Sequence, residues 1–338
     1  MTDTVTAHPR FGKKHLSIEI IVPPGVKRLN YQTGQYQTSE LAGQRISLKG
    51  YRVTCQIENV GQSQGNAAGI QVYNLPPDLM KSLTGFGTLS VFNYVASGND
   101  SQELGATVQV QIFTSNDTTD TLSNTDDQQD NQRNMVFWGS LQTCQAVMQA
   151  TPDPFVQMQC RTLGFAQFSP ASVISIKGAT KAADIAQNIG NTMGLAFENN
   201  GVNTVLQNPY FYGSAMQQLQ DLSQQALFNY TASNGVLSIW PIGGQRNPSS
   251  KSVTLINADS GMIGYPDFAG VSVTFRTLYN PSIRFGDQIR IESIVPNVTG
   301  DYTVNRTAHH LSADVPGGPW ETEVLATFFR NPIGTAGV

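Results

Sequence analysis

Alternating hydrophobic and polar positions recur along this chain with a period of two, which is typical of half-buried strands. In the C-terminal part, Val271, Val273 and Phe275 fall on one face and alternate with polar residues. Further alternating runs follow at 289–292, 302–307 and 320–328. Four strands within about 60 residues predict a small antiparallel barrel.

The N-terminal part shows the same period. Leu16, Ile18 and Ile20 share a face until Pro23-Pro24-Gly25 ends the run. We expect a polar loop up to residue 44, a short helix after Pro76-Pro77-Asp78, and further strands at 51–58, 70–74, 88–95, 106–114, 135–148 and 155–163. These strands predict a first β domain.

Helical spacing replaces the strand period between residues 176 and 245. Thr180 is expected to cap the start of a helix whose apolar residues recur every four positions, beginning with Ile185. Gly194 is expected to end this helix. Ser214 and Gln217 form a capping box for a second helix. We therefore expect a compact α+β unit in the middle of the chain.

Turn signals divide the chain further. Ser233-Asn234-Gly235 is a hairpin signal, and the run at 243–250 reads as a linker. A chain of 338 residues exceeds the usual limit for one hydrophobic core. We predict a mainly β (α+β) protein with two antiparallel β-barrel domains and a small α+β domain between them. The expected parts are a flexible N-terminal leader at 1–12, a first barrel at 13–170, the α+β domain at 171–250 and a second barrel at 251–338.

The segment 115–134 is almost devoid of apolar residues, so we expect a solvent-exposed loop. Its five aspartates lack the ordered spacing and the distal Glu of a calcium loop. The sequence predicts no metal site there.

Charged residues make up only 13% of the chain, and the net charge is -4. Such a surface repels neighbours weakly, which favours a subunit buried against other subunits, although ordinary variation in composition gives the same values. The longest basic run is Lys13-Lys14, so tight nucleic-acid binding is not expected. Neither a signal peptide nor a membrane span is predicted, and we expect the protein to remain in the cytoplasm in which it is made.

No catalytic motif emerges from the reactive residue types. His309 and His310 are adjacent on a predicted strand, so they point to opposite faces and cannot share a metal. Four aspartates could act as paired carboxylates of a glycosidase: Asp259, Asp267, Asp287 and Asp301. Each is predicted to lie in a turn that contains Gly or Pro, where an Asp side chain accepts hydrogen bonds from local backbone amides. The three cysteines, Cys55, Cys144 and Cys160, lack the spacing of a metal site or a redox motif, and we expect them to be buried as small hydrophobic residues. We expect Trp240 and Trp320 to be buried in a core or an interface. We predict no catalytic, cofactor-binding or metal-binding residues.

The order of short motifs along residues 40–329 resembles baseplate hub proteins of contractile-tailed bacteriophages, the late-control-D and VgrG hub-like family. The motifs are Lys49-Gly50-Tyr51-Arg52, the run 68–75, Val136-Phe137-Trp138-Gly139, Gly264-Tyr265-Pro266, Leu278-Tyr279-Asn280-Pro281, Phe285-Gly286-Asp287, Ile291-Glu292-Ser293, the run 300–304, His309-His310-Leu311 and Pro319-Trp320-Glu321-Thr322.

This resemblance implies a structural, non-enzymatic protein with two barrels that look like tail-tube subunits. Three chains would form a homotrimer that adapts a sixfold tail tube to a threefold central spike. The implied partners are the tail tube or tube-initiator protein, the spike, the tape measure protein and baseplate wedge proteins, with DNA only in transit and no direct membrane insertion. The implied location is the tail baseplate of the virion, after assembly in the host cytoplasm. Spike and wall-cutting roles would belong to other chains.

Two other classes remain open. The Tyr- and Asn-rich loops at 30–37 and 199–212 fit a carbohydrate-binding tail adhesin, and the aspartates fit a cell-wall hydrolase. Within the hub interpretation, the pairs Gln109/Gln111 and Gln157/Gln159 are candidates for the channel wall, because uncharged polar groups avoid gripping a passing polymer.

Overall fold

Strands dominate this computed structural model, which describes residues 13–30, 33–61, 65–84, 86, 107–117, 133–150, 152–164, 171–246 and 253–328. Alternate side chains of a strand point to opposite faces, and the burial of side chains along the strands follows the predicted period of two. Strand β6 (Asn66–Tyr73), for example, alternates buried and half-buried residues along its whole length. The mainly β prediction is confirmed.

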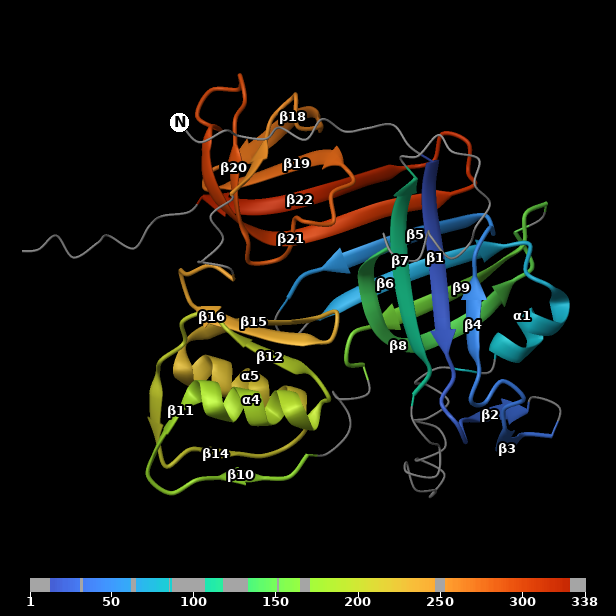
Figure 1. Cartoon of the computed structure of the whole chain (residues 1–338), viewed down its shortest axis with the longest axis horizontal. Coiled ribbons are helices and arrows are strands. Elements are labelled where there is room, and N and C mark those ends of the chain that lie inside the picture. Colours follow the sequence, from blue (N-terminus) through green and yellow to red (C-terminus); the bar gives the residue numbers. More distant parts are fainter. Residues whose placement is uncertain are drawn as a thin grey trace, which may run out of the picture.

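Most strands belong to one 13-stranded sheet (Figure 1). Its main path runs β18-β19-β22-β21-β5-β6-β9-β8-β7-β1-β4, with β20 paired to β21 and β17 paired to β20. The other bounds are β1 Lys13–Ile21, β4 Arg45–Leu48, β5 Val53–Asn59, β7 Gln109–Asp117, β8 Asn134–Val147, β9 Phe155–Arg161, β17 Thr254–Ile256, β18 Met262–Ala269, β19 Ser272–Leu278, β20 Gln288–Ile291, β21 Gly300–Ala313 and β22 Trp320–Phe328. The described path has two ends, β18 and β4, and does not close into a barrel. The two-barrel architecture stays a prediction.

Buried apolar side chains of the described residues form three cores. The N-terminal core combines residues between 16 and 160 with Leu311, Ala313 and Trp320. The helical core lies between residues 182 and 239. The C-terminal core lies between residues 256 and 326.

Strand β21 runs through two of these cores. Its residues Gly300–Thr303 pair with β20, and its residues Thr307–Ala313 pair with β5. Tyr302 and Val304 accordingly lie in the C-terminal core, whereas Leu311 lies in the N-terminal core. Strands from the two ends of the chain therefore share one continuous sheet.

Trp320 is buried, but in a different core from the one we expected. The sequence places it with Val324 and Phe328 in the second barrel, yet its indole is 8% exposed within the N-terminal core, while Val324 lies in the C-terminal core. Phe328 is 48% exposed and belongs to neither core. The alternation along β22 fixes which face is buried, but the strand is long enough for that face to pass from one core to the next.

The helical unit contains α4 (Ala182–Thr192) and α5 (Ala215–Ala226), which lie beside short strands (Figure 1). The strands are β10 Ile174–Ser175, β11 Ala179–Lys181, β12 Ala196–Asn199, β13 Val205–Gln207, β14 Tyr210–Phe211, β15 Phe228–Ser233 and β16 Val236–Pro241. Ser214 caps α5 as predicted, because its hydroxyl accepts a hydrogen bond from the Gln217 N–H at 3.3 Å.

The predicted cap of α4 is wrong. Thr180 lies in β11, and Lys181 occupies the N-cap position without a side-chain hydrogen bond. A backbone contact replaces the cap, since the Ala182 N–H donates to the Thr204 carbonyl at 2.9 Å. Met193 ends α4, and Gly194 follows with a positive φ of 71°, as the sequence indicated.

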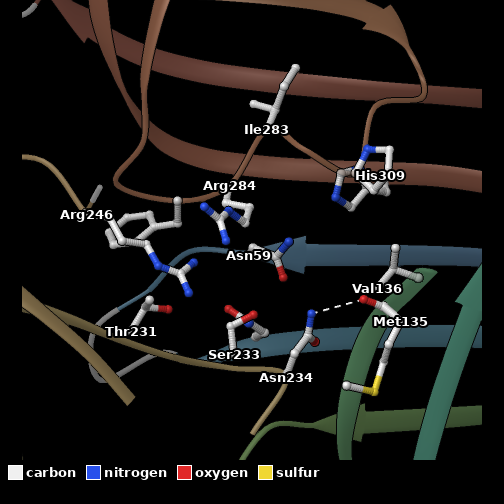
Figure 2. Close-up of a pocket in the computed structure, with 13 residues that line it drawn as sticks. Asn59, Met135, Val136, Thr231, Ser233, Asn234, Arg246, Ile283, Arg284 and His309 are labelled. Carbon is white, nitrogen blue, oxygen red and sulfur yellow. Dashed lines mark hydrogen bonds between the residues drawn. The ribbon is translucent and has the colours of Figure 1, made fainter. Parts of the chain in front are cut away.

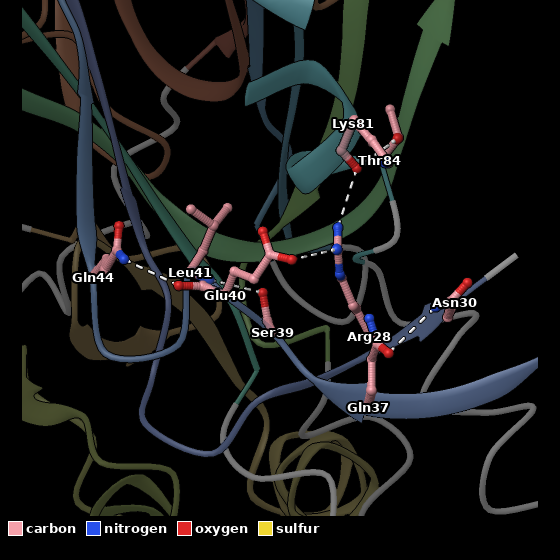
Figure 3. Close-up of polar contacts among 9 residues, drawn as sticks. All are labelled: Arg28, Asn30, Gln37, Ser39, Glu40, Leu41, Gln44, Lys81 and Thr84. Carbon is pink, nitrogen blue, oxygen red and sulfur yellow. Dashed lines mark hydrogen bonds and ion pairs between the residues drawn. The ribbon is translucent and has the colours of Figure 1, made fainter. Parts of the chain in front are cut away.

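Residues up to 44 are more ordered than the predicted loop. They contain the hairpin of β2 (Lys27–Asn30) and β3 (Gln35–Thr38), followed by β4. Arg28 joins this hairpin to the end of α1 (Pro77–Leu83) by donating to the Lys81 carbonyl at 3.3 Å, and it pairs with Glu40 at 3.6 Å (Figure 3). These contacts connect distant segments, so no local pattern predicts them.

Three sequence expectations fall outside the described residues. They are the leader at 1–12, the strand at 88–95 and most of the loop at 115–134. Strand β7 continues to Asp117 and β8 starts at Asn134, so the ends of that predicted loop belong to strands.

Candidate functional site

A small polar cavity of about 40 Å³ lies where the three cores meet (Figure 2). Side chains from all three units point toward it. It is lined by Asn59, Asn66, Met135, Val136, Thr231, Ser233, Asn234, Arg246, Pro281, Ile283, Arg284, Phe285 and His309.

Two glycines permit the close packing around this cavity. Asn234 and Gly235 form the predicted hairpin turn, both with positive φ, and Asn234 Nδ2 donates to the Met135 carbonyl at 3.1 Å. A Cβ on Gly235 would lie 2.3 Å from the Trp138 ring, and one on Gly286 would lie 2.5 Å from the Trp240 ring. The helical unit therefore packs against β8 on one side and against the C-terminal unit on the other.

Arg246 is the most unusual group at the cavity. The sequence placed it in a linker, but it is only 5% exposed, and its backbone N–H donates to the Gly286 carbonyl at 2.9 Å. Among the described residues its side chain forms no ion pair, and its Nε has no hydrogen-bond partner. Burial lowers the pKa of Arg246, and the nearby charge of Arg284 lowers it further, against the opposing effect of Asp287 and Glu198.

The neighbouring carboxylates are already engaged. Asp287 accepts from Arg284 Nε at 3.0 Å, and burial raises the pKa of this carboxyl despite that contact. Glu198 accepts from the Ser238 hydroxyl at 2.8 Å and from Asn200 Nδ2 at 3.0 Å. Burial raises the pKa of Glu198, but these two hydrogen bonds and the nearby charges of Arg246 and Arg284 outweigh it, and the pKa is lowered overall.

His309 is a buried neutral base at the same junction. Its Nδ1 lies 2.9 Å from the Thr322 hydroxyl, and its ring packs edge-on against Tyr279 at 5.4 Å. Burial, with a smaller contribution from His310, lowers the pKa of His309 to about 4. The ring is thus hydrogen-bonded on one side and packed against an aromatic ring on another, while it also lines the polar cavity.

The four predicted aspartates are not gathered into one site. Asp259 and Asp267 are exposed, Asp287 pairs with Arg284, and Asp301 lies 3.8 Å from Arg290. Within the described ranges no cluster of His, Cys, Asp or Glu could hold a metal ion. The prediction of no catalytic, cofactor or metal residues stays a prediction.

Comparison with known protein families gives a match over most of the chain. The model described as "Baseplate hub gp41" matches residues 36–316. The chain belongs to this baseplate hub family. The resemblance found in the sequence is thereby confirmed, and the protein is a structural component of a phage tail baseplate.

Solved tail proteins share the fold of this hub protein. A tail protein from Neisseria meningitidis is 9% identical, with a TM-score of 0.57, over 94% of this chain and 96% of that one. The 43 kDa tail protein of prophage MuSo2 from Shewanella oneidensis is 8% identical, with a TM-score of 0.54, over 94% and 97%. The E. coli c3393 protein, a type VI secretion component described as similar to T4 tail proteins gp27 and gp5, is 8% identical, with a TM-score of 0.50, over 83% and 74%. No curated protein matches the sequence. Within the described part of the hub chain, no helix has the length and apolar character needed to span a membrane.

One face of the hub sheet carries a row of uncharged polar side chains. Thr54, Gln71, Gln157 and Gln145 lie opposite one another across β5, β6, β9 and β8. Hydrogen bonds join Thr54 to Gln71 at 3.0 Å and Gln145 to Gln157 at 3.1 Å. The predicted channel residue Gln157 lies in this row and Gln159 lies in the next, whereas Gln109 and Gln111 are on β7, with β8 between.

The β18 end of the hub sheet exposes apolar residues. Tyr265 is 69% exposed, and Phe268 on the same strand is also exposed. Val271, which the sequence pattern placed on the buried face, is 63% exposed because it lies in the turn between β18 and β19. Sequence reasoning missed this surface, since the inward face was assigned by extending the strand period through the turn.

Proposed function

We propose that three copies of this chain form the ring-shaped hub of a phage baseplate, which joins the sixfold tail tube to the threefold spike. The family match over residues 36–316 carries this proposal. Its partners are then the tube or tube-initiator protein, the spike, the tape measure protein and the wedge proteins. Assembly takes place in the host cytoplasm, and the finished hub resides in the virion tail.

The symmetry adaptation rests on two β units per chain. Two units in each of three chains provide six positions for a sixfold tube. The separate N-terminal and C-terminal cores support this division, and β21 fixes one unit against the other. In our proposal each unit is a tail-tube-like barrel.

A ring of identical chains needs two different surfaces that fit each other. The β18 end of the described sheet, with Tyr265 and Phe268, supplies one such surface, because an edge strand with exposed apolar side chains invites association. A second copy is the occupant we assign to it.

The mass of the purified protein in solution tests the ring. Three chains of 36.6 kDa give a particle of about 110 kDa, visible as a ring in negative-stain images. Phe268→Glu combined with Tyr265→Glu should yield folded monomers, because both side chains are exposed. Val205→Glu changes an exposed residue of the helical unit and should leave the trimer intact. A monomeric wild-type chain at micromolar concentration, or a trimer that tolerates the double change, would contradict this interface.

The uncharged polar row supports a channel wall along which tape measure protein and DNA slide. Replacing Gln109, Gln111, Gln157 and Gln159 with Lys should slow genome ejection, since cations would hold passing phosphates. Unaltered ejection would argue against these residues lining the channel. We propose no enzymatic role, because the candidate aspartates are not gathered in one site, and no specific observation favours the adhesin alternative.

A further inference from the structure

We propose that the cavity at the junction of the three cores binds a small oxyanion, with inorganic phosphate or sulfate as the chemical class. The cavity contains a buried cation and neutral polar groups, and neither neighbouring carboxylate, Asp287 or Glu198, forms an ion pair with this cation. This proposal concerns the joining of units within one chain and is independent of trimer formation.

The charge of Arg246 is the main reason to expect an anion in this cavity. A guanidinium remains protonated in proteins, so burial cannot remove its charge. Taking an ion out of water is unfavourable unless an opposite charge compensates it. Among the described residues, Arg246 forms no ion pair, and the cation Arg284 lies on the same cavity. An anion between them would compensate Arg246 and reduce the repulsion.

The remaining lining supplies the donors that an oxyanion needs. Thr231 is 1% exposed and Ser233 is half-buried, and both point into the cavity (Figure 2). Asn59 has an Oδ1 atom without a partner, and its Nδ2 lies 3.1 Å from the Thr307 hydroxyl. Because that hydroxyl can donate as well as accept, the Asn59 amide can rotate and present its N–H₂ group to the cavity. Asn66 keeps its orientation, because its Nδ2 donates to the Ala232 carbonyl at 3.5 Å.

The size of the cavity limits the ligand. A buried water requires about 10–15 Å³, so a cavity of about 40 Å³ holds a few waters or one small oxyanion. Waters would satisfy the hydrogen bonds but would leave Arg246 without an ion-pair partner, since Asp287 and Glu198 act on it only through their nearby charge. A nucleotide or a sugar phosphate is too large.

Thermal unfolding of the full chain in phosphate tests the site. The comparison is sodium phosphate against sodium chloride at equal ionic strength, with isothermal titration of phosphate as the direct measurement. A ligand specific for the folded state raises the folded-to-unfolded ratio about 100-fold at 100 times its dissociation constant. We expect phosphate to raise the Tm of the wild type, and Arg246→Gln to abolish both this shift and the titration heat.

Two further variants keep the test decisive. Arg290→Gln removes an exposed arginine that does not line the cavity and should retain the full response. Thr231→Val keeps the shape of the side chain but removes one donor, so it should weaken phosphate binding at least several-fold even if Arg246→Gln fails to fold. Equal behaviour of the wild type in phosphate and in chloride would overturn the proposal, as would an undiminished response in both cavity variants.

Discussion

Trp320 packs edge to face against Tyr279, with ring centroids 5.4 Å apart, and both rings contact the N-terminal core although they belong to the C-terminal part of the chain. Lys14 of β1 places its ammonium 5.7 Å from the indole centroid. The first and last strands of the described chain thus meet at one aromatic side chain.

Replacing Trp320 with Ala should lower the free energy of unfolding of the full chain by about 3–5 kcal/mol, through lost burial and a residual cavity. Circular dichroism in increasing denaturant measures the change without relying on tryptophan fluorescence. Phe328→Ala on the same strand is the control and should cost less than about 1 kcal/mol, because that ring is half exposed. Equal losses in the two variants would show that Trp320 is not a core residue.

His309 should make stability depend on pH. Its pKa is lowered to about 4 in the folded state, so between about pH 6.5 and pH 4 the unfolded state binds more protons. Neutral His309 therefore makes its full contribution to the free energy of unfolding above about pH 6.5, and this contribution is lost as the pH falls toward 4. It amounts to on the order of 3 kcal/mol. Denaturant midpoints across this range measure it.

His309→Gln should flatten that dependence, whereas His310→Gln should preserve it. A wild-type slope that survives in the His309 variant would assign the proton uptake to another group.

The three cysteines should resist alkylation in the folded protein. Burial raises the pKa of Cys55 and of Cys144 to about 12, and it raises the pKa of Cys160 as well. A rise of three pKa units reduces the thiolate fraction about 1,000-fold. Mass spectrometry after iodoacetamide treatment at pH 7.5 should find unmodified chains in native buffer and three adducts in guanidinium. Rapid native labelling of Cys55 or Cys160 would contradict the burial of that thiol, and rapid labelling of the half-buried Cys144 would contradict its raised pKa.

Deletion within the polar segment 115–134 should be tolerated only when the residues that belong to β7 and β8 are kept. Removing 118–132 should leave the Tm nearly unchanged, because long surface insertions contribute little closure entropy. Removing 115–134 should lower it, since this also deletes the pairs of Ser115–Asp117 with β1, and Arg133, whose guanidinium lies 2.8 Å from the buried Glu19. Differential scanning fluorimetry of the two deletions distinguishes these outcomes. Equal Tm values would mean that the end of β7 adds no stability.

Local chemistry was predictable from the sequence. The Ser214–Gln217 cap and the Asn234-Gly235 turn are each specified by residues within four positions of one another. The predicted cap of α4 was wrong, because a distant carbonyl, that of Thr204, accepts the hydrogen bond at the start of the helix in place of the Thr180 side chain.

The junction could not be predicted in the same way. Asn66, Arg246 and His309 approach one cavity from positions far apart in the chain, and no motif in the sequence indicates that they meet. Arg246 lies among Gly, Gln and Asn, a composition typical of an exposed linker. Only the fold shows that its charge is buried.

The passage of β21 through two cores has a mechanical consequence. The β5–β21 pairing, from Thr307–Asn59 to Ala313–Val53, joins the two β units by backbone hydrogen bonds instead of by a flexible tether. A force that pulls the units apart along the strands would have to shear these bonds together, so the load is shared across the whole ladder. Under such a load the two β units would therefore move together instead of separating at a hinge.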